Sequence, residues 1–250
     1  MSSEKTTAIV IRLVEFSESS CVVTLFTRDF GKISGLAKGA RRPKSAFESA
    51  LDLLAVCRIV FLHKSSDTLD LLTEAKLERR FRSATRDLSR LYAGYYVAEL
   101  LHDLTDHGDP HPELFDAADA ALQALDGTGE VAAIMARFEL CLLRYVGHLP
   151  ELENCVDCGA AIASTGRVSF GQQSGGVLCQ RCRAGKRQIV SVNVETIALL
   201  RKLASDQGPW AETTLEPKRR GELRGVLNHY MTNLIGRRPQ MYKFMGTMVG

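Results

Sequence analysis

The sequence predicts an α+β protein of several domains, in which a small five-stranded barrel precedes a helical domain that contains an inserted four-cysteine module. Five short β-branched runs without helical spacing lie before residue 79. From there on, apolar residues recur three and four apart, which is typical of amphipathic helices. A polar stretch with four cysteines separates two such helical parts. We expect domains at 1–78, 79–150, 151–187 and 188–250.

Each expected strand is a β-branched or aromatic run that ends at a polar or glycine-containing turn. The runs are one that begins at Thr6, then Cys21–Thr27, Lys32–Ala37, Leu51–His63 and Thr68–Leu77, with a turn at 64–67 before the last. Five short strands leave unpaired edges unless their sheet closes. A five-stranded oligonucleotide-binding barrel (OB-fold) is one compact way to remove those edges.

Cations are concentrated in one segment of this region. The net charge of the whole chain is only +3, so bulk charge does not indicate a nucleic-acid partner. Between residues 28 and 44, however, six cations face one acid, Asp29; the cations are Arg28, Lys32, Lys38, Arg41, Arg42 and Lys44. Such side chains can follow a phosphate backbone without requiring one base sequence. The segment therefore predicts a DNA-binding loop, and the alternative is a solvated loop that keeps the protein soluble.

Phe30 and Phe47 lie beside or within this segment and are weaker candidates for stacking on bases. The alternative for both is a place in the apolar core, which their apolar neighbours favour.

The rest of the chain predicts helices. Their expected extents are one from Arg79 to the break at His107, then Glu113–Leu125, Glu130–Leu149, Val190–Ser205 with a break at 208–209, and Thr214–Ile235. The first would carry four arginines along one face, either for a polyanion or as a solvated stripe: Arg79, Arg82, Arg86 and Arg90. The outer face of the last would carry Lys218, Arg219, Arg220 and Arg224.

The four cysteines of the module form two CxxC pairs, Cys155 with Cys158 and Cys179 with Cys182. A tight turn at Gly159 and a hairpin bend at 175–176 would bring the pairs together. The separation of the pairs lies at the upper edge of four-cysteine zinc spacings. Four thiolates fill a tetrahedral shell, so we expect one structural zinc ion and no catalysis there. Redox-active thiols, disulfides and buried free thiols are the alternatives.

The three remaining cysteines have apolar neighbours and are expected in the core: Cys21, Cys57 and Cys141. No phosphate-binding loop, dinucleotide motif, HExxH or GxSxG motif occurs in the sequence, so no enzyme activity is predicted. No secretory signal and no apolar run of membrane-spanning length is visible. We therefore expect a cytoplasmic protein without a membrane partner.

Three separated segments together resemble the bacterial RecO family of recombination mediators. The first runs from Ala8 through Gly31-Lys32 to Ala37-Lys-Gly-Ala-Arg-Arg-Pro-Lys-Ser45, which carries the most specific part of the match. The second runs from Leu142 to Gly159 and includes Cys155-Val-Asp-Cys158. The third joins Ser169-Phe170 to Gly175-Gly-Val-Leu-Cys-Gln-Arg-Cys182.

The resemblance implies an OB-fold, a helical domain, a zinc module at the four cysteines and DNA contact at Lys38, Arg41, Arg42 and Lys44. It also implies binding of single- and double-stranded DNA, strand annealing, and loading of RecA with RecR onto DNA coated by single-stranded DNA-binding protein. The tail of that protein is an expected ligand, RecF is a further candidate partner, and the protein would be associated with the nucleoid. Three alternatives stay open: a zinc-ribbon transcription regulator, a zinc-stapled enzyme and a pure interaction scaffold.

Overall fold

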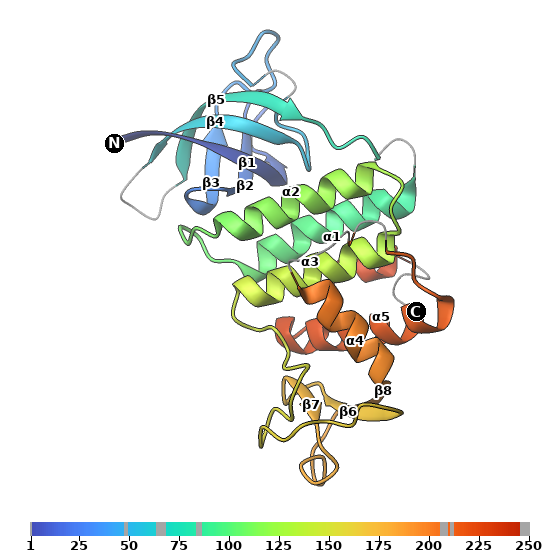
Figure 1. Ribbon diagram of the computed structural model, residues 1–250. Coiled ribbons are helices and arrows are strands. Elements are labelled where there is room, and N and C mark those ends of the chain that lie inside the picture. The colour runs from blue at the N-terminus through green and yellow to red at the C-terminus, as the bar shows by residue number, and fades with distance from the viewer. Residues whose placement is uncertain are drawn as a thin grey trace. The chain divides into compact units, whose positions relative to one another are not determined.

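The structure is a computed structural model that describes residues 2–47, 50–63, 69–83, 87–205, 210 and 213–245. Two compact units make up the chain, Met1–Asp126 and Gly127–Gly250 (Figure 1). Arg86, the turn expected at 64–67 and the helix break expected at 208–209 lie outside the described residues. Within the described ranges, no helix combines the length and the apolar character that crossing a bilayer requires.

The first unit begins with a five-stranded sheet, as predicted. Its strands are β1 (Ser2–Glu15), β2 (Cys21–Thr27), β3 (Gly31–Ala37), β4 (Val56–His63) and β5 (Asp70–Arg79). The order β1-β2-β3-β5-β4 returns to its start, because β4 pairs antiparallel with the first half of β1. Only the β3–β5 pair is parallel among the described pairs. Each strand therefore has a hydrogen-bonded neighbour on both sides.

Apolar side chains from all five strands fill the interior of this sheet. Val23, Leu25 and Ile59 are fully buried there, and each such side chain stabilises the fold by about 1.5–3 kcal/mol. Phe47 joins this cluster, and Phe30 packs against it with its ring edge-to-face on Phe61, 5.3 Å between centroids. The core interpretation of both phenylalanines is therefore confirmed.

The first unit also includes the helices α1 (Leu88–Leu104) and α2 (Pro112–Asp126). Asp87 caps α1 by accepting hydrogen bonds from the backbone N–H groups of Ser89 and Arg90. The predicted arginine stripe is wrong, because α1 starts at Leu88.

Arg79 instead ends β5 and forms an ion pair with Asp119 of α2, while the Arg82 backbone N–H donates to Asp126. Of the three arginines that the structure describes, only Arg90 is found in the helix, on its first turn.

The described part of the second unit includes three longer helices, a short 3₁₀ helix and a small sheet. The elements are α3 (Val131–Tyr145), β6 (Arg167–Gly171), β7 (Gly176–Leu178), β8 (Ile189–Asn193), α4 (Val194–Ala204), α5 (Pro217–Ile235) and η3 (Gln240–Lys243). The helix expected from Val190 is partly wrong, since Ile189–Asn193 pairs with β6 as a strand. Asn193 then caps α4 by accepting from the backbone N–H of Glu195.

A buried ion pair lies between the helices of this unit. The Arg224 guanidinium donates to both carboxylate oxygens of Glu139, at 2.6 and 2.9 Å, and to the amide oxygen of Asn228 at 2.7 Å. The side chains of Arg224 and Glu139 are 1% and 0% exposed. The prediction that Arg224 lies on the outer face of α5 is therefore wrong. A charge left alone at this depth would be costly, so this pair fixes how α3 and α5 meet.

Candidate nucleic-acid interface and candidate metal centre

The basic loop, residues 38–45, follows β3 and is hydrogen-bonded into a defined shape. The Arg41 backbone N–H donates to the carbonyl of Ser19, and the Gly39 N–H donates to the hydroxyl of Ser20. Within the loop the Ser45 hydroxyl donates to the carbonyl of Ala40. Lys44 adopts a positive φ of 59°, which is uncommon for a residue with a side chain. These contacts tie the loop to the β1–β2 turn.

Three cations of this loop project into solvent: Lys38, Arg42 and Lys44. Across the described residues, no carboxylate forms an ion pair with any of them. Arg41 differs, because its guanidinium lies 3.0 Å from a carboxylate oxygen of Glu15 at the end of β1. Both side chains of that pair are substantially exposed, so the pair is weak and easily opened.

Arg28, by contrast, is paired with a carboxylate of its own unit. Its guanidinium donates to both carboxylate oxygens of Asp116 on α2, at 3.0 and 2.9 Å. This two-pronged contact raises the pKa of Arg28. The side chain remains half-exposed, but its charge is already matched.

Lys32 lies in the interior. Only 6% of the residue is exposed, and its ammonium donates to the carbonyls of His102 and Thr105 at 2.6 and 2.5 Å. Both carbonyls belong to the end of α1, where a helix leaves acceptors unpaired and favours a cation.

Burial lowers the pKa of Lys32, while the carboxylates of Asp106 and Asp103 act in the opposite direction. The prediction that Lys32 contacts a phosphate is therefore not supported, because its charge joins β3 to α1.

An aromatic residue that sequence patterns did not single out begins the turn to which the basic loop is hydrogen-bonded. Phe16 follows β1 and is 65% exposed. Its backbone N–H donates to Ser20 in the turn that also holds the loop. The only sequence signal for it was an aromatic residue directly before a polar turn, which is a weak one.

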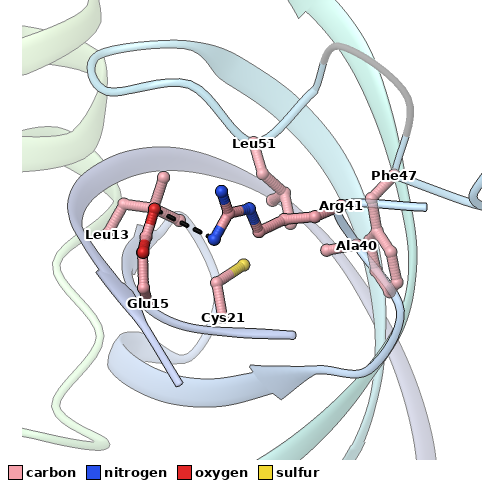
Figure 2. A pocket seen from close by; sticks show the side chains of 7 residues that line it. All are labelled: Leu13, Glu15, Cys21, Ala40, Arg41, Phe47 and Leu51. Carbon is pink, nitrogen blue, oxygen red and sulfur yellow. Dashed lines mark ion pairs between the residues drawn. The ribbon is translucent and has the colours of Figure 1, made fainter. Parts of the chain in front are cut away.

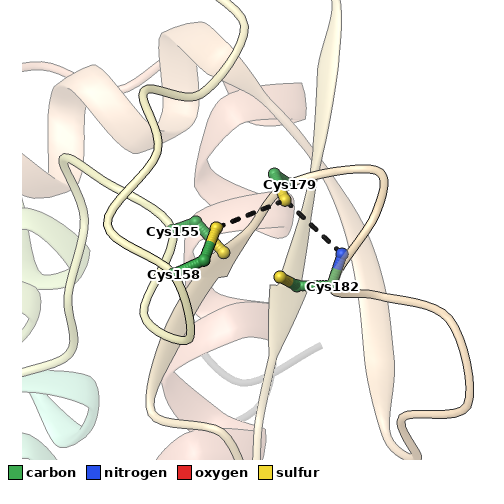
Figure 3. Close-up of side chains that lie close together, drawn as sticks. All are labelled: Cys155, Cys158, Cys179 and Cys182. Atoms are coloured by element: carbon green, nitrogen blue, oxygen red, sulfur yellow. Dashed lines mark hydrogen bonds between the residues drawn. The ribbon is translucent and has the colours of Figure 1, made fainter.

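The four cysteines of the two CxxC pairs come together in the second unit (Figure 3). Their sulfur atoms all lie within 4.8 Å of one another, and those of Cys158 and Cys179 are 3.8 Å apart. Zinc–sulfur bonds of about 2.3 Å in a tetrahedron place sulfur atoms about 3.8 Å apart. The cluster could therefore bind a metal ion, and its donor set fits zinc.

Backbone pairing brings together the two turns that carry the CxxC pairs, residues 155–158 and 179–182, which we call the knuckles. Gly175 takes a positive φ of 81° in the β6–β7 hairpin, which confirms the expected bend. The next residue, Gly176, pairs with Glu151, whose backbone would collide with any Cβ at that position. The Val156 N–H then donates to the carbonyl of Val177 at 2.9 Å. This register sets the first knuckle directly against the second.

The electrostatics of the four thiols also fit a cation. Burial opposes ionisation of Cys155, but backbone N–H groups of Cys179, Cys158 and Asp157 outweigh it and lower its pKa to about 6. Hydrogen bonds to Cys158 and Cys179, burial and the charge of Cys155 raise the pKa of Cys182 to about 12. Without a positive ion, ionising one thiol thus suppresses ionisation of another. A divalent cation would remove that conflict.

The module is attached to the helices of its unit on two sides. The guanidinium of Arg201 on α4 donates to the carbonyl of Leu152 at 2.8 Å. The hydroxyl of Tyr230 on α5 donates to the carbonyl of His148 at 3.0 Å, and its ring meets Phe170 of β6 edge-to-face. The cysteine module is therefore anchored to α4 and α5 by these contacts.

The fold and the site define an α+β protein with a basic loop on a five-stranded sheet and a candidate four-cysteine metal centre. Comparison with known proteins identifies its family. Residues 1–81 match the family described as "Recombination protein O N terminal", and residues 85–242 match "Recombination protein O C terminal".

The DNA repair protein RecO of Rhodopirellula baltica is 43% identical, covering 95% of this chain and 97% of that protein. Proteins of the same name from Myxococcus xanthus and Anaeromyxobacter dehalogenans (strain 2CP-1) are 33% and 34% identical over 95% and 98% of this chain, and 95% and 96% of their own lengths.

The chain belongs to the RecO family. Membership supports a role in DNA repair and recombination.

The position of Lys32 makes a direct prediction. Replacing it (Lys32→Met) removes the donor to two carbonyls at the end of α1 and should lower the free energy of unfolding by about 1–3 kcal/mol. Lys38→Met, on the exposed loop, should change it by less than about 0.5 kcal/mol. Urea denaturation of both variants measures this, and equal stabilities would contradict the structural role of Lys32.

Proposed function

We propose that this protein is a recombination mediator that binds single- and double-stranded DNA and anneals complementary strands. With RecR, it would help load RecA onto DNA coated by single-stranded DNA-binding protein. It acts by binding and has no catalytic turnover. The observation that carries the proposal is the basic loop: across the described residues its Lys38, Arg42 and Lys44 project into solvent without an ion-pair partner, whereas Lys32 and Arg28 are matched within the fold.

The proposed mechanism is electrostatic. Lys38, Arg42 and Lys44 contact phosphates, and Arg41, paired with Glu15, contacts the DNA beside them. Neutralising phosphates on two strands reduces their mutual repulsion, so complementary bases can meet. The hydrogen bonds that fix the loop support this, because a shaped loop loses less conformational entropy on binding. In this proposal the five-stranded sheet is an OB-fold barrel that presents the loop.

The proposed metal is one structural zinc ion held by Cys155, Cys158, Cys179 and Cys182. Bound there, zinc would supply a positive centre that keeps all four thiolates ionised and close together. Arg181, whose pKa is raised by its hydrogen bond to Cys158, and Lys186, which lies 2.7 Å from Asp157, would be positioned by the knuckles. With all four ligands from protein, the ion has no open position for chemistry.

The proposed partners besides DNA are RecR, the C-terminal tail of single-stranded DNA-binding protein and RecF. The proposed location is the cytoplasm, in association with the nucleoid. The proposed domain boundaries remain 1–78, 79–150, 151–187 and 188–250.

The DNA-binding role of the loop is tested by removing two unpaired cations, Arg42→Gln with Lys44→Gln. Binding should weaken equally for unrelated sequences, because phosphates carry no sequence information. The slope of log affinity against log salt should fall by about 0.7 per lost contact on single strands and about 0.9 on duplex. Fluorescence anisotropy with labelled oligonucleotides over a salt series measures both effects.

A matched control is Lys218→Gln with Arg219→Gln, which makes the same change of charge on α5. An unchanged affinity and slope in the loop variant, or an equal effect in the control, would exclude the loop as the contact. A preference for one duplex site over random DNA would favour a transcription regulator. Saturable turnover of a substrate would favour an enzyme, and no DNA binding at low salt would favour a scaffold.

The zinc proposal predicts one metal ion per chain in protein purified under reducing conditions. Elemental analysis should return about one zinc, and Cys158→Ser with Cys182→Ser should lower that ratio strongly, because only two thiolates remain. Cys57→Ser, which changes a buried thiol of the first unit, is the control that should keep the metal. Wild-type protein without metal would reject the proposal.

A further inference from the structure

A pocket of about 370 Å³ opens between the end of β1, the start of β2 and the basic loop (Figure 2). Its walls are mainly apolar, and the side chains that form them are Leu13, Cys21, Ala40, Phe47 and Leu51. Small-molecule sites have volumes of about 300–1,000 Å³, so this pocket suits one flat ring system. It is too small for a helix or a folded segment.

The Cys21 thiol that lines this pocket is uncharged at neutral pH. Burial raises the pKa of the Cys21 thiol, and the opposing effect of the Arg41 charge is smaller. The polar groups of the pocket are Arg41 and Glu15, whose ion pair Figure 2 shows beside the apolar residues. Their side chains are 48% and 76% exposed, so the pair lies at the solvent side. An apolar slot thus has one donor group and one acceptor group at its mouth.

We propose that this pocket receives one unpaired nucleobase of a DNA single strand while the basic loop holds the adjoining phosphates. The inference rests on the proposed function, since it assumes that the loop contacts DNA, and it adds a site that distinguishes single strands from duplex. The flat faces of a base would lie against Leu13 and Leu51, and its edge would meet Arg41 and Glu15.

The charges favour a base over an acidic peptide as the occupant. The edge of a base carries both donors and acceptors, which match a guanidinium and a carboxylate side by side. An acidic peptide would be attracted by the loop but repelled by Glu15 at the mouth. The guanidinium of Arg41 can also stack on a base, a contact that binds single strands without sequence preference.

The pocket also excludes paired bases. A base in a duplex is stacked between neighbours and bonded to its complement, and it must be extruded before it can enter. An unpaired base avoids that cost. The pocket therefore adds affinity for single strands alone, whereas the loop cations act on phosphates of both forms.

The test compares two oligonucleotides of equal length and charge, an oligothymidine and the same backbone with abasic sites throughout. Wild-type full-length protein should bind the base-bearing strand at least about fivefold more tightly, since each stacked base adds that much or more. Filling the pocket with Ala40→Leu should cut this preference by about fivefold without changing the affinity for the abasic strand. Val14→Leu adds carbon to an exposed β1 side chain outside the pocket and should preserve the preference.

Each outcome is decisive. Equal affinity of wild-type protein for both strands overturns the pocket but leaves the proposed phosphate contact intact, and it does so even if Ala40→Leu does not fold. An equal preference in Ala40→Leu and Val14→Leu also overturns it. A third result would overturn the pocket as a base site. In that result an acidic, apolar-tipped peptide binds wild-type protein but not Ala40→Leu, while the two proteins have the same affinities for DNA. Failure of wild-type protein to bind either strand at low salt rejects the proposed function itself.

Discussion

A cation that leaves water must find an anion or a carbonyl oxygen inside the fold, and this constraint divides the basic side chains of the chain into two groups. Lys32 and Arg224 satisfy it with internal partners and so act as structural contacts, and the half-exposed Arg28 is matched by Asp116. Lys38, Arg42 and Lys44 stay in water and keep their charge for a ligand. The net charge of +3 hides this division. A polyanion site needs only a few free cations on one shaped loop.

A similar constraint applies to the four-cysteine cluster, where the charges that need a partner are negative thiolates. Backbone N–H groups lower the pKa of Cys155 to about 6, whereas hydrogen bonds to Cys158 and Cys179, burial and the charge of Cys155 raise that of Cys182 to about 12. Backbone pairing at Gly176 and the contacts to α4 and α5 hold the thiols together. Four thiol groups held within 4.8 Å of one another could bind a metal ion. Its four protein ligands suit a structural role.

Local patterns predicted the features that depend on neighbours in sequence. The five β-rich runs, the glycine bend before Cys179 and the meeting of the two CxxC pairs all follow from spacing and turn chemistry. The wrong predictions concern residues whose environment or secondary structure is set by a partner distant in sequence. Lys32 meets α1 70 residues away, and Arg224 meets Glu139 85 residues away, so neither could be distinguished from a surface cation. Ile189–Asn193 borders a helical pattern, and only its pairing with β6 makes it a strand. The pocket beside the basic loop likewise needs residues from separate strands.

The central claim is that DNA contact belongs to the basic loop of the first unit, while the cysteine module only holds the shape of the second. The most direct measurement compares DNA affinity before and after the metal is removed by a chelator under reducing conditions, with cleavage by trypsin as the monitor of local order. The account predicts that residues 154–186 become susceptible to trypsin while the affinity and its salt slope stay the same. Loss of DNA binding in step with loss of the metal, while the first unit stays folded, would contradict it.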